Sequence, residues 1–149
     1  MVELRTDPPE RSSHDGPHKP DTEALRHMDV LGVGDDDDAR ELLGGMLELA
    51  RCRVRLAASP TEALELLAAW RPDAIVSDVG MPESDGYEFL RKLRALEGAA
   101  GRQAPAIALT GYATASHRLA GQEAGFEFYL AKPVEPMVLY ASLARVRRL

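Results

Sequence analysis

Short apolar runs alternate with segments of helical periodicity from Met28 to the end of the chain. The runs are rich in Val, Ile, Leu and Ala, which is typical of buried strands. They predict strands at residues 29–33, 54–57, 74–77, 106–109 and 126–130. Between them, apolar residues recur every three or four positions and predict five helices, at 38–51, from Pro60, after Asp85, at 115–124 and at 135–148. Strands that alternate with helices predict an α/β fold with a parallel sheet covered on both faces.

Polar residues mark the start of two of these helices. Ser59 precedes Pro60, a favoured first helical residue, and Glu62 follows at the spacing of a capping box. We therefore expect Ser59 to cap the second helix. Asp38 is the expected cap of the first helix, because aspartate accepts hydrogen bonds from the free amide groups there.

Residues 1–27 differ in composition from the rest of the chain. They contain many charged residues, few apolar ones and four prolines, Pro8, Pro9, Pro17 and Pro20. Such a segment buries too little apolar surface to order itself. We therefore predict a disordered tail at 1–27 and a single domain at 28–149. The tail histidines have no regular spacing, so we expect solvated side chains there rather than a metal site.

Composition and charge narrow the classes of partner. The chain has 149 residues and a net charge of −6, which argues against a nucleic-acid surface. Its one cysteine, Cys52, cannot form an internal disulfide, which suits a reducing compartment. No apolar run approaches the roughly 18 residues of a membrane span, and the N-terminus has no secretory signal. We expect a cytoplasmic protein that binds neither nucleic acid nor membrane.

Side chains that can support phosphoryl transfer follow four of the predicted strands. Asp35 follows the first strand, Asp78 the third, Thr110 the fourth and Lys132 the fifth. The carboxyl ends of parallel strands lie at one edge of a sheet, so these side chains are expected to converge. Two carboxylates suit Mg²⁺, and an aspartate can accept a phosphoryl group that a metal and a lysine stabilise.

Other interpretations of the first acidic run are weaker. Asp35-Asp36-Asp37-Asp38 is also typical of a solvated helix start. It lacks the glycine and the final glutamate of a calcium-binding EF-hand loop. Gly32-Val33-Gly34 lacks the third glycine of a dinucleotide-binding loop.

The strand-end segments resemble the motifs of receiver domains from two-component response regulators. The matching segments are Gly34-Asp35-Asp36-Asp37, Ser77-Asp78-Val79-Gly80-Met81-Pro82, Ala108-Leu109-Thr110-Gly111 and Ala131-Lys132-Pro133. The resemblance extends from Met28 to the end of the chain. It implies a flavodoxin-like, doubly wound sheet of five parallel strands in the order 2-1-3-4-5, with five helices.

The resemblance also implies a role for individual residues. Asp78 would be the phosphoacceptor, and Mg²⁺ would be bound by Asp35, Asp78 and the backbone carbonyl of Gly80. Lys132 would contact the phosphoryl group. Thr110 would be the switch hydroxyl and Tyr129 the aromatic switch residue. The bond from Lys132 to the following proline is expected to be cis.

Glycines replace two residues that are usual in this family. Gly34 stands where the first of two adjacent acids is expected, when the chain is aligned through Arg40. We predict weaker Mg²⁺ binding and slower phosphorylation, unless Asp36 substitutes for the missing acid. Gly32 replaces a branched residue inside the first strand, which we expect to weaken that strand locally.

The implied function is a phosphorelay receiver rather than an enzyme with a separate substrate. Its only chemistry would be self-phosphorylation from phosphohistidine and autodephosphorylation. The partners would be a histidine kinase or phosphotransfer protein and an unknown output protein. The chain ends after the last predicted helix, so we expect output by protein contact or onward phosphotransfer, or a chain that belongs to a hybrid kinase. The alternatives are an unphosphorylated pseudo-receiver that binds proteins and a small-ligand binder on the same fold.

Overall fold

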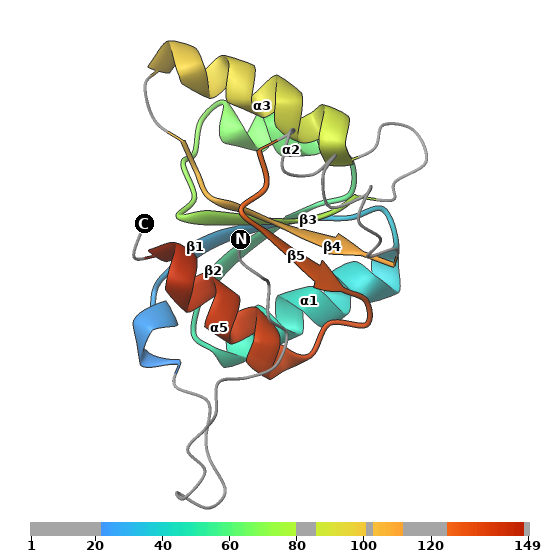
Figure 1. Cartoon of the computed structure of the whole chain (residues 1–149), viewed down its shortest axis with the longest axis vertical. Helices are drawn as coiled ribbons and strands as arrows, with labels where there is room; N and C mark the ends of the chain where they lie inside the picture. The colour runs from blue at the N-terminus through green and yellow to red at the C-terminus, as the bar shows by residue number, and fades with distance from the viewer. Residues whose placement is uncertain (1–21, 80–85, 101–102, 112–124, 148–149) are drawn as a thin grey trace, which may run out of the picture.

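A single parallel sheet forms the centre of the molecule. The computed structural model describes residues 22–79, 86–100, 103–111 and 125–147. The strands lie in the order β2-β1-β3-β4-β5 (Figure 1). Their bounds are β1 (Asp29–Val33), β2 (Arg53–Ala57), β3 (Ala74–Asp78), β4 (Ala106–Thr110) and β5 (Phe128–Ala131). The predicted doubly wound, flavodoxin-like sheet is therefore confirmed.

Helices cover both faces of this sheet. One face carries α1 (Asp37–Leu49) and α5 (Pro136–Arg147), and the other carries α2 (Pro60–Leu67) and α3 (Gly86–Ala100) (Figure 1). The described part of the chain has four α-helices where five were predicted. The predicted helix at 115–124 lies outside the described residues.

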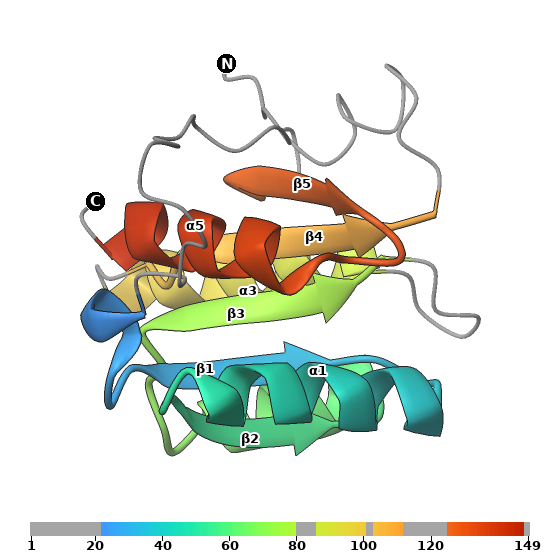
Figure 2. The ribbon, with the colours of Figure 1, turned by 90° about the horizontal axis from the view of Figure 1, so that it is seen from below.

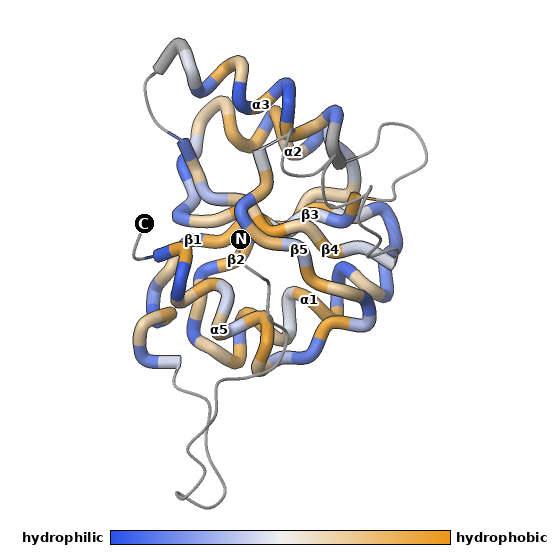
Figure 3. The backbone as a smooth tube through the Cα atoms, in the orientation of Figure 1, coloured by the Kyte–Doolittle hydropathy of each residue, from blue (hydrophilic) through white to orange (hydrophobic). Residues whose placement is uncertain are grey.

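Side chains that alternate along the strands divide the core into two layers. Val30 and Val76 belong to the cluster shared with α1 and α5, whereas Leu31 and Ile75 belong to the cluster shared with α2 and α3. Successive side chains of a strand point to opposite faces, so one strand serves both layers. Every residue of β3 and β4 is buried, and the central strands are mostly orange in Figure 3. These two strands hold the carboxyl edge of the sheet in place.

The folded part begins before the predicted boundary at Met28. Glu23–Leu25 form a 3-10 helix, η2, and Leu25 is fully buried in the layer beneath α1 and α5. The His27 amide donates to the Arg51 carbonyl at 2.8 Å. The prediction of a tail through residue 27 was therefore wrong for residues 22–27. Composition averaged over this proline-rich stretch hid a single leucine that anchors it.

The helix starts agree with the sequence in one case and differ in the other. The Glu62 amide donates to Ser59 Oγ at 3.1 Å, and Glu62 Oε1 accepts from the Ala58 amide, so the predicted cap of α2 is confirmed. In α1 the cap is Asp36 instead of Asp38. Four consecutive aspartates leave the position of the cap undetermined in the sequence. In the structure Asp36 has the extended backbone of a cap residue, and its carboxylate accepts from the free amides of the first turn.

Gly32 lies where two leucines meet the sheet. A β-carbon at Gly32 would approach Leu56 Cδ2 to 2.9 Å and Leu43 Cδ2 to 3.0 Å. The leucines thus fill the space that a branched side chain would take. Gly32 keeps its register with both neighbouring strands, opposite Leu56 in β2 and Val76 in β3. The pairing of β1 is therefore continuous through the glycine that was expected to weaken it.

Candidate functional site

The carboxyl ends of four strands bring the predicted polar residues to one edge. All neighbouring strands are parallel, and their arrows point to the same edge in Figure 2. Asp78 is the last residue of β3, and Thr110 is the last residue of β4. Lys132 directly follows β5, and Asp35 follows β1 by two residues. Gly80, the predicted backbone ligand, lies outside the described residues.

Asp78 and Lys132 form an ion pair at the centre of this edge. Lys132 Nζ donates to Asp78 Oδ2 at 3.0 Å. Asp78 is only 9% exposed, whereas the Lys132 side chain is 39% exposed. A carboxylate this deeply buried needs a charged or hydrogen-bonded partner. The pair thus places the Lys132 ammonium group beside the buried Asp78 carboxylate.

The backbone holds this pair in register. The Lys132 amide donates to the Thr110 carbonyl at 2.9 Å, and the Val79 amide donates to the Leu109 carbonyl at 3.1 Å. These bonds continue the parallel ladders one residue beyond the strands. The Lys132-Pro133 peptide bond is cis, as expected.

Thr110 and Tyr129 lie on neighbouring strands beneath the edge. Thr110 is 2% exposed and pairs in register with Ala131 of β5. Tyr129 is buried, and its ring packs against Phe126 with the centroids 6.3 Å apart. Both side chains thus lie within the packed sheet. Thr110 is on the strand next to that of Asp78, and Tyr129 is one strand further.

The loop between β1 and α1 carries the acidic run. Asp36 Oδ1 accepts hydrogen bonds from the amides of Asp38, at 2.9 Å, and Ala39, at 3.2 Å. Asp36 therefore serves as the helix cap rather than as a substitute for an acid at position 34. Asp35 is exposed on the loop between this cap and Gly34. Of the four aspartates in the run, it lies nearest in sequence to the end of β1.

The oxygen groups at this edge fit a hard cation such as Mg²⁺. Asp35 and Asp78 follow adjacent strands, and carboxylate oxygens are ligands that Mg²⁺ prefers. Among the described residues, a β-carbon on Gly34 would meet one atom within 4 Å, the Asp78 β-carbon at 3.7 Å, so position 34 lies beside Asp78. Among the described residues, no three His, Cys, Asp or Glu side chains form a metal cluster. Such a cation would therefore depend on two carboxylates, backbone and water.

Sequence reasoning used Arg40 only to align the loop and missed its contacts. Arg40 Nη1 donates to the Gly34 carbonyl at 2.8 Å, and Nη2 lies 2.6 Å from Asp37 Oδ1. The pairing of Asp37 with Arg40, three residues apart in a helix, is a signal that the sequence does contain. The contact with Gly34 depends on how the loop turns and has no such signal.

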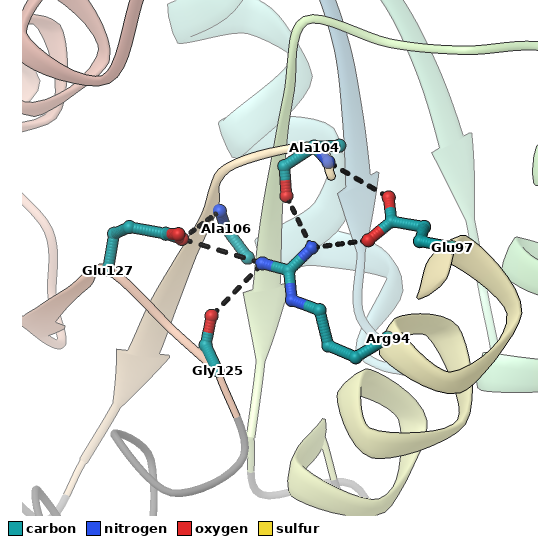
Figure 4. Close-up of polar contacts among 6 residues, drawn as sticks. All are labelled: Arg94, Glu97, Ala104, Ala106, Gly125 and Glu127. Atoms are coloured by element: carbon teal, nitrogen blue, oxygen red, sulfur yellow. Dashed lines mark hydrogen bonds and ion pairs between the residues drawn. The ribbon is translucent and has the colours of Figure 1, made fainter. Parts of the chain in front are cut away.

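A second polar cluster lies at the opposite edge of the sheet and was also missed. Arg94 of α3 donates to the carbonyls of Ala104, at 2.7 Å, and Gly125, at 3.0 Å (Figure 4). Glu97 and Glu127 flank its guanidinium. Burial raises the pKa of the Glu127 carboxyl, opposed by the Ala106 amide and the Arg94 charge. This cluster ties α3 to the segments that enter β4 and β5, far from the Asp78 edge.

The chain is similar to known receiver domains over most of its length. Residues 30–144 match the response regulator receiver domain profile. The chain is 46% identical over 117 residues to an uncharacterized 14.6 kDa protein from the sodA1 3' region of Leptolyngbya boryana, covering 78% of this chain and 88% of that protein. It is 43% identical over 122 residues to the response regulator MprA of Mycobacterium leprae, covering 82% of this chain. The chain spans about half, 50%, of that relative's length.

A solved structure shares the same architecture. It is the receiver domain of the sensor histidine kinase PA1611 from Pseudomonas aeruginosa PAO1, with a magnesium ion coordinated in its active-site cleft. The TM-score is 0.74 at 34% identity, with 82% of this chain and 98% of that chain covered. No helix in the described ranges is long and apolar enough to cross a membrane. Strand order, polar edge and sequence agree, and the chain belongs to the response regulator receiver domain family.

Proposed function

We propose that Asp78 accepts a phosphoryl group from the phosphohistidine of a histidine kinase or phosphotransfer protein. The observation that carries the proposal is the contact between Asp78 and Lys132, 3.0 Å apart at the carboxyl edge of the sheet. A cation held beside a buried carboxylate can neutralise the charge that a phosphoryl group would bring.

The transfer would exchange one bond for another on phosphorus. A carboxylate oxygen of Asp78 attacks the phosphorus atom, and the bond from phosphorus to the histidine nitrogen breaks. The electron pair of that bond stays on the ring nitrogen. Because the other ring nitrogen keeps its proton, the histidine that departs is neutral. The Lys132 ammonium group, which donates to the Asp78 carboxylate before the transfer, would then donate to a phosphoryl oxygen. The Thr110 hydroxyl, one strand away, would donate to one of those oxygens.

Asp35 and Asp78 would hold Mg²⁺ together with the backbone carbonyl of Gly80. When bound, Mg²⁺ offsets the repulsion between the carboxylates and the incoming phosphoryl oxygens. Gly34 supplies no side-chain charge, and Asp36 is engaged as the cap of α1. The proposed site therefore binds Mg²⁺ more weakly than a site with an acid at position 34.

Phosphorylation would shift the populations of two surface states. Inward movement of Thr110 and a rearrangement of Tyr129 would change the surface formed by β5, α5 and the predicted helix at 115–124. That surface would bind the output protein in the cytoplasm. On this proposal the chain catalyses two reactions only: its own phosphorylation from phosphohistidine and its own dephosphorylation.

A pseudo-receiver that binds partners without phosphorylation is the second candidate. Gly34 favours it, because the edge holds one acid fewer than the receiver pattern. The pairing of Asp78 with Lys132 favours the phosphoacceptor instead, because it places a cation beside the carboxylate that would receive the phosphoryl group.

Intact-mass measurement after incubation with acetyl phosphate tests the proposal. We expect a Mg²⁺-dependent gain of one phosphoryl group in the natural chain and in Asp38→Asn, a control that removes a nearby exposed charge. Asp78→Asn is expected to gain none, and Lys132→Met to gain far less than the natural chain. A folded natural chain that gains nothing would contradict the proposal. Labelling that appears only in Gly34→Asp would favour the pseudo-receiver.

A further inference from the structure

Both backbone groups of Gly34, the residue before Asp35, are held by hydrogen bonds. The Gly34 amide donates to the Ala57 carbonyl at 3.1 Å, which extends the pairing of β1 with β2. The Gly34 carbonyl accepts from Arg40 Nη1 at 2.8 Å. Because glycine lacks a β-carbon, its backbone has more freedom than that of any other residue. The hydrogen bond from Arg40 removes freedom at this point that an acidic residue would have removed by its own side chain.

The Arg40 guanidinium spans the loop that presents Asp35. Its second nitrogen, Nη2, lies 2.6 Å from Asp37 Oδ1, on the far side of Asp35 in sequence. The Arg40 side chain is 19% exposed, whereas that of Asp37 is 89% exposed. An exposed ion pair of this kind stabilises little by itself. The more buried contact with the Gly34 carbonyl is therefore the one that orients the peptide before Asp35.

We infer that Arg40 is a positioning residue that orients Asp35 toward a divalent cation at the carboxyl edge. The inference rests on the proposed function, because Asp35 and Asp78 are the carboxylates assigned there to Mg²⁺. Arg40 does not contact the cation itself. It acts by restricting the Gly34–Asp35 peptide, while the Asp36 cap restricts the residue that follows.

The sign of the effect separates positioning from simple electrostatics. Arg40 is a positive charge near a cation site, so its removal by charge alone would strengthen Mg²⁺ binding. If Arg40 orients Asp35, its removal weakens binding. Arg40→Met removes both the charge and the donors. Arg40→Lys keeps the charge but loses the planar fork that reaches two acceptors at once.

The experiment is a Mg²⁺ titration followed by amide NMR of the full chain. Only signals of the folded protein are followed, so a loss of stability alone does not alter the dissociation constant. We expect Arg40→Met to raise the constant about tenfold, the lower end of the losses seen when groups that support metal ligands are removed. Arg40→Lys is expected to raise it by less, and Arg71→Gln, which removes an exposed charge just before β3, to leave it unchanged.

Two outcomes would overturn the inference, and they are distinguishable. If the natural chain binds Mg²⁺ and Arg40→Met binds it equally or more tightly, Arg40 does not position Asp35, and the proposed function stands. If the natural chain shows no Mg²⁺-dependent shifts at all, the metal assignment in the proposed function fails together with the inference.

Discussion

Gly34 lies directly beside Asp78: a β-carbon built on the glycine would be 3.7 Å from the Asp78 β-carbon, an ordinary contact distance. Gly34 directly follows β1, Asp78 ends the neighbouring strand β3, and both residues are buried. Among the described residues, a β-carbon at position 34 meets no closer contact. A substitution at position 34 therefore places a new side chain next to Asp78.

Gly34→Asp is expected to strengthen Mg²⁺ binding. An added carboxylate a few ångströms from the cation contributes about 1 kcal/mol in the high effective dielectric of a surface site, roughly a fivefold lower dissociation constant. Gly34→Asn is the matched control, because it adds the same shape without the charge. Equal affinities of the two variants and the natural chain, measured by titration, would contradict the predicted role of position 34.

Arg51→Gly is expected to stabilise the protein by about 1 kcal/mol. Arg51 follows the C-cap of α1, Ala50, with a φ of 68°, a conformation that suits glycine. The bonds of a Schellman cap surround it, from the Arg51 amide to the Glu48 carbonyl at 2.9 Å and from the Cys52 amide to the Leu47 carbonyl at 3.1 Å. Urea unfolding measures the change. Arg51→Ala keeps the β-carbon and should show little gain, so an equal gain in both variants would point to charge instead.

Gly125→Ala is expected to destabilise the protein by about 1–3 kcal/mol. Gly125 has a φ of 109°, and its β-carbon would lie 2.9 Å from Arg94 Nε. The substitution would strain the backbone and press on the guanidinium that holds the Gly125 carbonyl (Figure 4). Gly98→Ala is the control, because a β-carbon there meets nothing within 4 Å and the residue lies in α3. Thermal unfolding that ranks Gly125→Ala at or above Gly98→Ala would refute this account.

Stability is expected to fall as the pH rises from about 9 to about 11. Burial raises the pKa of Cys52 from 9.0 to about 11, although the Arg147 charge lowers it. The thiol of the unfolded chain ionises first, so the free energy of the unfolded state falls above pH 9, and the loss of stability is complete near the folded pKa. Two pKa steps correspond to about 3 kcal/mol at most. Unfolding free energies of the natural chain and Cys52→Ala, compared across this range, isolate the thiol.

Tyr140 is the group that this comparison must separate from Cys52. Burial raises the pKa of its phenol, which donates to the Met46 carbonyl at 2.7 Å. Its ionisation opposes folding at high pH in the same direction. Cys52→Ala retains the burial of Tyr140, the larger cause of its raised pKa, and removes only the smaller contribution of the Cys52 charge. The difference between the two profiles therefore belongs to the thiol and to its coupling with Tyr140. Profiles that run parallel from pH 8 to 11 would show that the thiol does not titrate as expected.

Local patterns in the sequence correctly predicted much of the fold. The apolar run of Ala74-Ile75-Val76 became a wholly buried strand, and Ser59 became the cap of α2. Both depend on residues within a few positions of one another. The predicted cap of α1 was wrong because the run offers the same side chain at four positions, and the backbone conformation of Asp36 decides which one caps the helix. The N-terminal boundary was wrong because Leu25 is anchored by a core that forms elsewhere in the chain.

The sequence by itself determined the alternation of strands and helices, and with it the edge to which Asp35, Asp78, Thr110 and Lys132 would come. Periodicity and strand-end position are local properties, and parallel strands necessarily share their carboxyl edge. Only the tertiary structure decided that Lys132 pairs with Asp78, that Arg40 holds the Gly34 carbonyl, and that Arg94 joins α3 to the entrances of β4 and β5. Those contacts join residues whose distances and directions depend on how the packed helices and strands are placed.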